Sequence, residues 1–116
     1  MEKEISGWID MEDMISSVQS LSKTADVFLD DKVIARNFVD AEGKNCSLGY
    51  VLPGEFDVTV EDSETVEVLG GSFRIQLPGE EEYSEFKRGE SFYIPEGASY
   101  HLVVDDYFDY CVIFGL

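Results

Sequence analysis

At 116 residues the chain is the right length for one domain, and its 44% hydrophobic and 13% aromatic content is that of a globular protein. Its 25 acidic and eight basic residues give a formal net charge of −17, which argues against nucleic-acid polymers and membranes as partners. The apolar runs are too short for a membrane span, and the first residues lack the pattern of a signal peptide, so we expect a cytoplasmic protein.

The acidic residues are spread along the chain, which is typical of a solvated surface, although a cation site is the alternative. An anionic small substrate would need a local basic pocket within this negative field. The two cysteines, Cys46 and Cys111, lie in apolar segments and form no Cys-x-x-Cys pair. We expect both to be reduced and to pack as small hydrophobic side chains.

Residues 10–22 are predicted to form a helix. Asp10 can cap its N-terminus, and apolar residues fall on one face at helical spacing: Met11, Met14, Ile15, Val18 and Leu21. This face is expected either to pack on the flank of the main domain or to form a dimer contact. Trp8 is expected to anchor the segment, so we divide the chain into a helical extension, residues 1–26, and a β domain, residues 27–116.

From residue 27 onward the hydrophobic pattern has period two. Apolar side chains alternate with polar ones in residues 56–60, 73–77, 100–104 and 108–114. Glycine and proline turn signals separate these runs at residues 42–43, 53–54, 70–71, 78–79, 88–89 and 95–97. Short strands joined by such turns predict an all-β sandwich or barrel.

The segment of residues 89–97 narrows this prediction. This segment resembles the second motif of the cupins, in which a glycine, five residues, a proline, one residue and a glycine follow one another. The expected fold is therefore a double-stranded β-helix, or jelly-roll barrel. In metal-binding cupins this motif leads to a histidine, but Tyr100 stands at that position and His101 follows it. The offset of one residue turns His101 to the opposite face of a strand.

The first cupin motif starts at Gly49, and its ligand positions carry the carboxylates Glu55, Asp57 and Glu61 in place of two histidines and a glutamate. With His101 as the single histidine of the chain, a three-histidine site is impossible. We expect no metal, although oxygen ligands suit calcium or manganese.

Across residues 28–114 the chain resembles the pyrimidine/purine nucleoside phosphorylase family of small single-domain cupins. The matching residues are Lys32, Val33, Phe38, Gly49, Gly54, Glu55, Phe56, Glu64, Gly71, Leu77, Pro78, Gly89, Phe92, Pro95, His101, Leu102 and Tyr110. The resemblance implies a pentosyl transfer in which a nucleoside and inorganic phosphate give ribose 1-phosphate and free base. It implies no cofactor other than the phosphate co-substrate, no metal, and a homodimer.

The reaction needs groups for the ribose, the phosphate and the departing base. For a chain that resembles this family, Glu55 is the expected catalytic acceptor for the ribose diol and His101 the expected catalytic donor to the base or the phosphate. Further substrate-binding residues are expected to be Asp57, Arg74, Lys32, Arg36, Phe92, Tyr100 and Tyr110, the cations for phosphate and the aromatic side chains for stacking. Alternatively, the polar residues of this set face solvent and the aromatic ones belong to the core.

The chain also departs from the family pattern. Asn45 and Ile113 stand where the family carries arginines, and Tyr83 stands where it carries a tryptophan. Two fewer arginines weaken a phosphate site in a domain that is already strongly negative. The alternative function is therefore a non-catalytic cupin that binds a small molecule or serves in assembly, and a metal-dependent sugar isomerase is a third.

Overall fold

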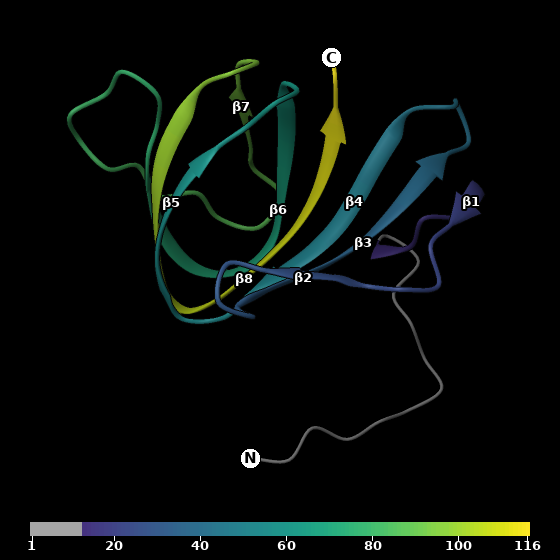
Figure 1. The fold of residues 1–116 in the computed structure, drawn as a ribbon, viewed down its shortest axis with the longest axis horizontal. Helices are drawn as coiled ribbons and strands as arrows, with labels where there is room; N and C mark the ends of the chain where they lie inside the picture. The colour runs from purple at the N-terminus through teal and green to yellow at the C-terminus, as the bar shows by residue number, and fades with distance from the viewer. Residues whose placement is uncertain (1–12) are drawn as a thin grey trace, which may run out of the picture.

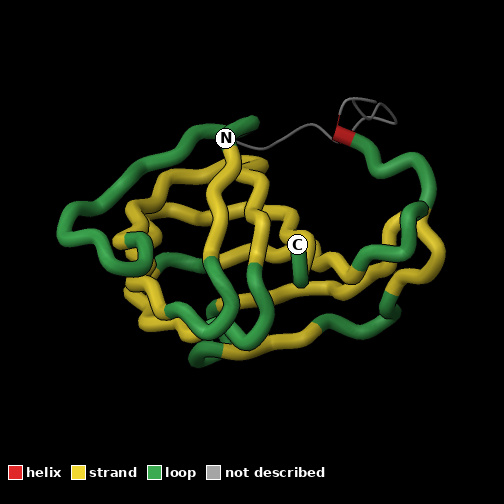
Figure 2. Tube along the Cα trace, turned by 90° about the horizontal axis from the view of Figure 1, so that it is seen from above, coloured by secondary structure: helices red, strands yellow, loops and turns green. Residues whose placement is uncertain are grey.

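The computed structural model describes residues 13–116, and eight strands make up most of this part of the chain (Figure 1). They are β1 (Val18–Leu21), β2 (Asp26–Phe28), β3 (Val33–Asp40), β4 (Asn45–Val51), β5 (Gly54–Thr59), β6 (Glu64–Gln76), β7 (Ser91–Ile94) and β8 (Ser99–Phe114). The prediction of an all-β fold is confirmed. Figure 2 shows the strands from above, with the long loop between β6 and β7 at one end of the molecule.

One rolled sheet contains all eight strands. Its main path runs β1-β3-β4-β8-β6-β7, with β2 added to β3 and β5 added to β8, and every pairing is antiparallel. The first half of β8 pairs with β5 and its second half with β4, while β6 runs beside both halves. The long strands β6 and β8 therefore belong to both walls of the roll, and the molecule closes around the space between the walls.

The bend that allows this lies where β6 passes the middle of β8. The register of the two strands shifts on either side of Gly71, which has a φ of +98°. A Cβ atom at this position would overlap the backbone carbonyl of Tyr107. Only glycine combines this backbone angle with so close an approach, so Gly71 is required for the bend.

The core follows the period-two pattern of the sequence. Alternate residues of β5 to β8 turn inward and are buried, as expected for a half-exposed sheet. The cupin-like segment behaves as predicted: Gly89 makes the turn with a φ of +90°, Phe92 and Ile94 are buried, and β7 ends just before Pro95.

The prediction of a helix over residues 10–22 is wrong in the part that the structure describes. Residues 14–17 have no regular structure, and Val18–Leu21 form strand β1, which pairs with β3. The serines at positions 16, 17, 20 and 22 are weak helix formers, whereas the edge of β3 offers a ladder of backbone hydrogen bonds. Leu21 is 58% exposed, so the apolar stripe does not pack as predicted. Residues 10–12 and the anchor Trp8 lie outside the described residues.

The cysteines are both free, Cys46 buried and Cys111 half-buried. Burial raises the pKa of both thiols, to about 11 for Cys111, so both remain protonated at neutral pH. Over residues 13–116, no helix has the length and apolar character needed to cross a membrane.

Candidate functional site

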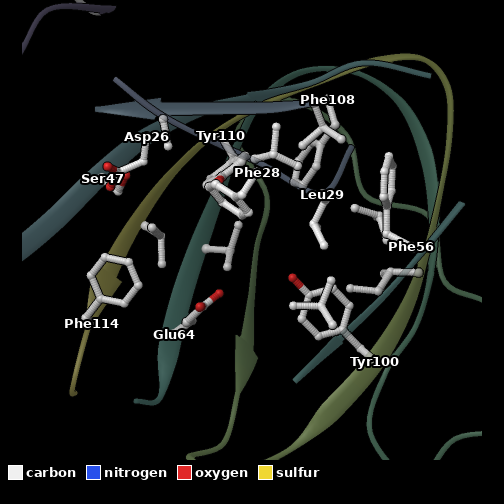
Figure 3. Close-up of a pocket in the computed structure, with 18 of the residues that line it drawn as sticks. Asp26, Phe28, Leu29, Ser47, Phe56, Glu64, Tyr100, Phe108, Tyr110 and Phe114 are labelled. Atoms are coloured by element: carbon white, nitrogen blue, oxygen red, sulfur yellow. The ribbon is translucent and has the colours of Figure 1, made fainter. Parts of the chain in front are cut away.

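A cavity of about 270 Å³ lies inside the roll (Figure 3). All strands from β2 to β8 contribute residues to its lining, because their inward side chains converge there. This volume is near the lower end of the range of small-ligand pockets, roughly 300–1,000 Å³. Most of the lining is apolar, and aromatic rings form much of it: Phe28, Phe56, Phe92, Tyr100, Phe108, Tyr110 and Phe114.

Three of the aromatic residues predicted for substrate stacking, Phe92, Tyr100 and Tyr110, line this cavity together. Tyr110 owes its place to Gly49, which faces it across β4 and β8. A Cβ atom at Gly49 would overlap the Tyr110 ring, so the glycine leaves room for the ring against the backbone of β4. Burial raises the pKa of both phenols, that of Tyr110 to about 12, so both remain O–H donors.

Glu64 brings a carboxyl group into the cavity at the first residue of β6 (Figure 3). It has the same inward parity as Val66 and Val68, which are core residues. No side-chain hydrogen bond or ion pair to Glu64 is formed from within residues 13–116. Burial raises the pKa of its carboxyl. The charge of Glu64 in turn contributes to the raised pKa of Tyr100 and Tyr110, which places the three groups near one another.

Apart from the two phenols, the other polar side chains of the cavity, Asp26, Asn37 and Ser47, have hydrogen-bond partners. Asn37 Nδ2 donates to Asp26 Oδ2 at 2.9 Å, and Ser47 Oγ donates to the backbone oxygen of Arg36 at 3.3 Å. Glu64 is therefore the carboxylate of the cavity whose two oxygens are both available to a ligand.

Among residues 13–116, no lysine, arginine or histidine lines this cavity. The three cations predicted to bind phosphate lie outside it. Arg74 pairs with Asp105 at 3.4 Å, Arg36 donates to the backbone oxygen of Lys23 at 2.6 Å, and Lys32 Nζ donates to the backbone oxygen of Pro53 at 3.3 Å. Arg36 points away because its neighbours on β3, Ala35 and Asn37, both face the cavity.

Glu55, Asp57 and His101 do come together, but on the outer face of the roll. His101 Nδ1 lies 2.7 Å from Asp57 Oδ1, and His101 Nε2 lies 3.4 Å from Glu55 Oε1. The histidine side chain is 24% exposed, and the carboxylates of Glu55 and Asp57 are 71% and 91% exposed. The hydrogen bond to Asp57, and then that to Glu55, raises the pKa of His101 against the opposing effect of burial.

The strand period explains this placement. Phe56 and Val58 of β5, and Tyr100 and Leu102 of β8, face the cavity, so the residues between them face outward. The predicted site residues therefore divide into an inner aromatic group and an outer polar group, and do not form a single site. Within residues 13–116, no group of three or more histidine, cysteine, aspartate or glutamate side chains is arranged to hold a metal ion.

Lys32 and Glu55 share a shallow outer groove of about 230 Å³, which Asp30 and Asp57 also line. Leu29 and Phe56 line both this groove and the cavity, so they form the partition between them. Lys32 is thus a cation that borders the cavity from outside, within an acidic setting.

Glu64 is the cavity residue for which the sequence predicts no role, although it is among the residues that match the family. A signal was present, because Glu64 stands at an inward position of the run Glu64-Thr-Val-Glu-Val68, where both following inward residues are valine. A charged residue in phase with core positions costs folding free energy, and such residues are often found at binding or catalytic sites.

Comparisons with known proteins agree with the fold and with the sequence resemblance. The family profile described as pyrimidine/purine nucleoside phosphorylase matches residues 23–114. A protein of that name from Syntrophotalea carbinolica is 37% identical over 92 residues, which are 79% of this chain and 88% of the relative.

Two solved structures extend the comparison. A protein of unknown function from Acidithiobacillus ferrooxidans superposes with a TM-score of 0.78 at 28% identity, covering 90% of this chain and 98% of that chain. An RmlC-like cupin from Shewanella frigidimarina superposes with a TM-score of 0.58 at 14% identity, covering 72% and 75% of the two chains. The second likeness shows the fold alone, and it confirms the predicted cupin barrel.

Proposed function

The chain belongs to the pyrimidine/purine nucleoside phosphorylase family, and from this premise we propose that it cleaves nucleosides with inorganic phosphate, at the inner cavity. The observation that carries the proposal is the cavity itself, with aromatic walls, two protonated phenols and a carboxylate, Glu64, that no side chain of residues 13–116 pairs with. Apolar walls with a few convergent polar groups and a perturbed pKa are the usual signature of a small-molecule site.

In this reaction a phosphate oxygen forms a bond to C1′ of the ribose while the bond from C1′ to the base nitrogen breaks. The base leaves with the electron pair of that bond and is neutralised by a proton. The phenol of Tyr100 is suited to stabilise the departing base by donating a hydrogen bond, because burial keeps it protonated. Aromatic walls accept both purines and pyrimidines, since ring stacking does not depend on the hydrogen-bond pattern of the base.

Phosphate is the substrate that the cavity is least suited to bind, because the described lining of the cavity contains no cationic side chain. Lys32 is the cation that borders the cavity, across the partition of Leu29 and Phe56. We therefore propose that phosphate approaches from the side of the outer groove, and that its binding is weak because Asp30, Glu55 and Asp57 share the groove with Lys32.

The same charge distribution favours a second candidate function. Glu64 and Asp26 give the cavity a negative character that suits a neutral or cationic ligand and repels phosphate. On this reading the protein binds a small polar molecule without chemistry.

One experiment separates the two functions. Purified protein is incubated with a mixture of adenosine, guanosine, inosine, uridine and cytidine, with and without phosphate, and free base and ribose 1-phosphate are quantified by chromatography. The proposal predicts base release that requires phosphate and is matched by ribose 1-phosphate. If no nucleoside is cleaved in the presence of phosphate, the phosphorylase proposal is wrong and the binding function takes its place.

A further inference from the structure

The cavity contains a carboxylate whose role neither the sequence nor the relatives assign. Glu64 is partly buried, faces inward at the start of β6 ahead of the core valines Val66 and Val68, and has no side-chain partner within residues 13–116. Keeping such a group unpaired costs folding free energy, since burial disfavours its charged form. The position is thus unfavourable for stability, and a ligand that supplies hydrogen-bond donors would relieve the penalty.

The lining of the cavity indicates which part of a nucleoside would supply the hydrogen-bond donors to Glu64. Purine and pyrimidine nucleosides differ in the base and share the pentose, so a carboxylate that serves both is best placed to contact the pentose. The rest of the lining fits this division, because it is mainly aromatic and aliphatic and suits bases of different hydrogen-bond pattern. The other polar side chains, Asp26, Asn37 and Ser47, are engaged with each other or with the backbone.

We propose that Glu64, together with the hydroxyl of Tyr110, forms a ribose subsite that selects ribonucleosides over 2′-deoxyribonucleosides. The placement of a nucleoside in the cavity rests on the proposed function. The two oxygens of Glu64 accept from the 2′- and 3′-hydroxyls of the ribose, and the phenols are neighbours of the same carboxylate (Figure 3). Glu64, which faces the cavity, thus replaces Glu55 as the proposed acceptor for the ribose diol.

Selectivity follows from the loss of one donor. A 2′-deoxyribonucleoside leaves one oxygen of the partly buried Glu64 carboxylate unpaired. Leaving a charged acceptor without its donor costs more than leaving a neutral acceptor without one. Sites built to bond a hydroxyl group reject analogues that lack it. We expect roughly 10- to 100-fold weaker binding of the deoxy compound.

The pH dependence of binding gives a second signature. The titratable groups that line the cavity with Glu64 are Asp26, Tyr100 and Tyr110. The phenols titrate far above neutrality, and Asp26 accepts a hydrogen bond from Asn37. The ionised form of Glu64 has both oxygens free to accept, so ribonucleoside affinity should increase as the pH rises through the elevated pKa of Glu64.

The test is calorimetric titration of the full chain, without phosphate, with adenosine and 2′-deoxyadenosine and with cytidine and 2′-deoxycytidine. The expected result is the stated preference for both ribonucleosides, reduced to less than about threefold, with loss of the pH dependence, in Glu64→Gln. The matched control is Glu67→Gln, on the same strand and exposed, which should retain the full preference. Tyr110→Phe, which keeps the ring, should weaken ribonucleoside binding without abolishing it, and it serves if Glu64→Gln does not fold.

Equal binding of ribo- and deoxyribonucleosides overturns the proposal, as does an unchanged preference in Glu64→Gln or the absence of binding by either class. The failure of the proposed function is visible separately. Ribose-selective binding without phosphate-dependent base release refutes the phosphorylase and leaves the subsite standing. Base release at equal rates from ribo- and deoxyribonucleosides refutes the subsite and leaves the phosphorylase standing.

Discussion

The two faces of strands β5 and β8 carry opposite chemistry. Inside, Tyr100 and Leu102 face a cavity lined by aromatic rings and by Glu64, a carboxylate without a side-chain partner among the described residues 13–116. Outside, His101 sits between two carboxylates, Asp57 and Glu55, that are largely open to solvent. The outer carboxylates are exposed and hydrogen-bonded to His101, whereas Glu64 is partly buried and has no side-chain partner within residues 13–116. A ligand gains most from polar groups that are shielded from water and free to form hydrogen bonds. The inner face is therefore the better functional candidate.

The most direct test of this difference between the two faces is to remove the inner and the outer carboxylate in separate variants. Glu64→Ala should lower phosphate-dependent turnover by about 100-fold or more, because it removes buried contacts to the ribose. Glu55→Ala should change turnover by less than about threefold, since the side chain is exposed and faces away from the cavity. The measurement is kcat/KM for one purine and one pyrimidine nucleoside.

Stability provides the control for this pair. The folded-state pKa of Glu64 is raised, so the folded protein holds the proton more tightly, and Glu64 lowers stability once the pH passes the unfolded value of about 4.3. Glu64→Gln should therefore match or exceed the wild type in melting temperature at pH 8. If Glu64→Gln unfolds the protein and Glu55→Ala abolishes turnover, the assignment of the two faces is reversed.

Next in size is the effect of filling the space beneath Tyr110. Gly49→Ala places a methyl group where the Tyr110 ring now lies, so the ring must move. We expect about tenfold weaker nucleoside binding and a loss of stability of about 1–3 kcal/mol, measured by calorimetry and by urea unfolding. Unchanged affinity together with lower stability would show that Tyr110 contributes to the core alone.

A smaller effect is expected for phosphate. Lys32→Gln should raise the KM for phosphate by about threefold to tenfold with little change in the KM for nucleoside, because Lys32 borders the cavity on its outer side. Arg74→Gln is the matched control, since Arg74 pairs with Asp105 on the outer surface and does not line the cavity. Equal effects of the two substitutions would indicate only a general loss of positive charge.

The smallest effect concerns the outer cluster. The folded-state pKa of His101 is raised, chiefly by Asp57, so its contribution to stability is complete below the unfolded pKa of about 6.5 and is lost as the pH rises through the folded value. The difference in unfolding free energy between wild type and His101→Gln should be at most about 1 kcal/mol at pH 5.5, because both carboxylates are exposed, and smaller at pH 8.5. A difference that grows with pH would contradict the assigned contacts.

The sequence predicts much of the barrel and only part of the site, and the strand period accounts for both results. The alternation of apolar residues and the glycine turns correctly predict that Phe92 and Ile94 are buried and that β7 ends before Pro95. The matching motifs correctly predict the family of the chain. The same alternation puts His101 on the opposite face from Tyr100, so a common site for both was not compatible with the pattern.

Two features depend on contacts between distant segments, and local pattern does not reveal them. Val18–Leu21 has helical spacing of apolar residues, but it pairs as an edge strand because β3 offers it a ladder. The meeting of Glu64 with Tyr100 and Tyr110 depends on how β6 and β8 curve together around Gly71. The family match includes Glu64, Gly71 and Tyr110, but the environment that Glu64 and Tyr110 share is visible only in three dimensions.

The central claim is that ligand binds inside the roll and not at the outer cluster. The chain has one histidine, so the imidazole signals of His101 report on the outer face without ambiguity in an NMR titration with adenosine. We expect large shifts for the ring signals of Tyr100 and Tyr110 and for the amide of Glu64, with the imidazole signals of His101 unmoved. Saturable shifts of the His101 imidazole with the Tyr100 and Tyr110 signals unchanged would contradict binding inside the roll.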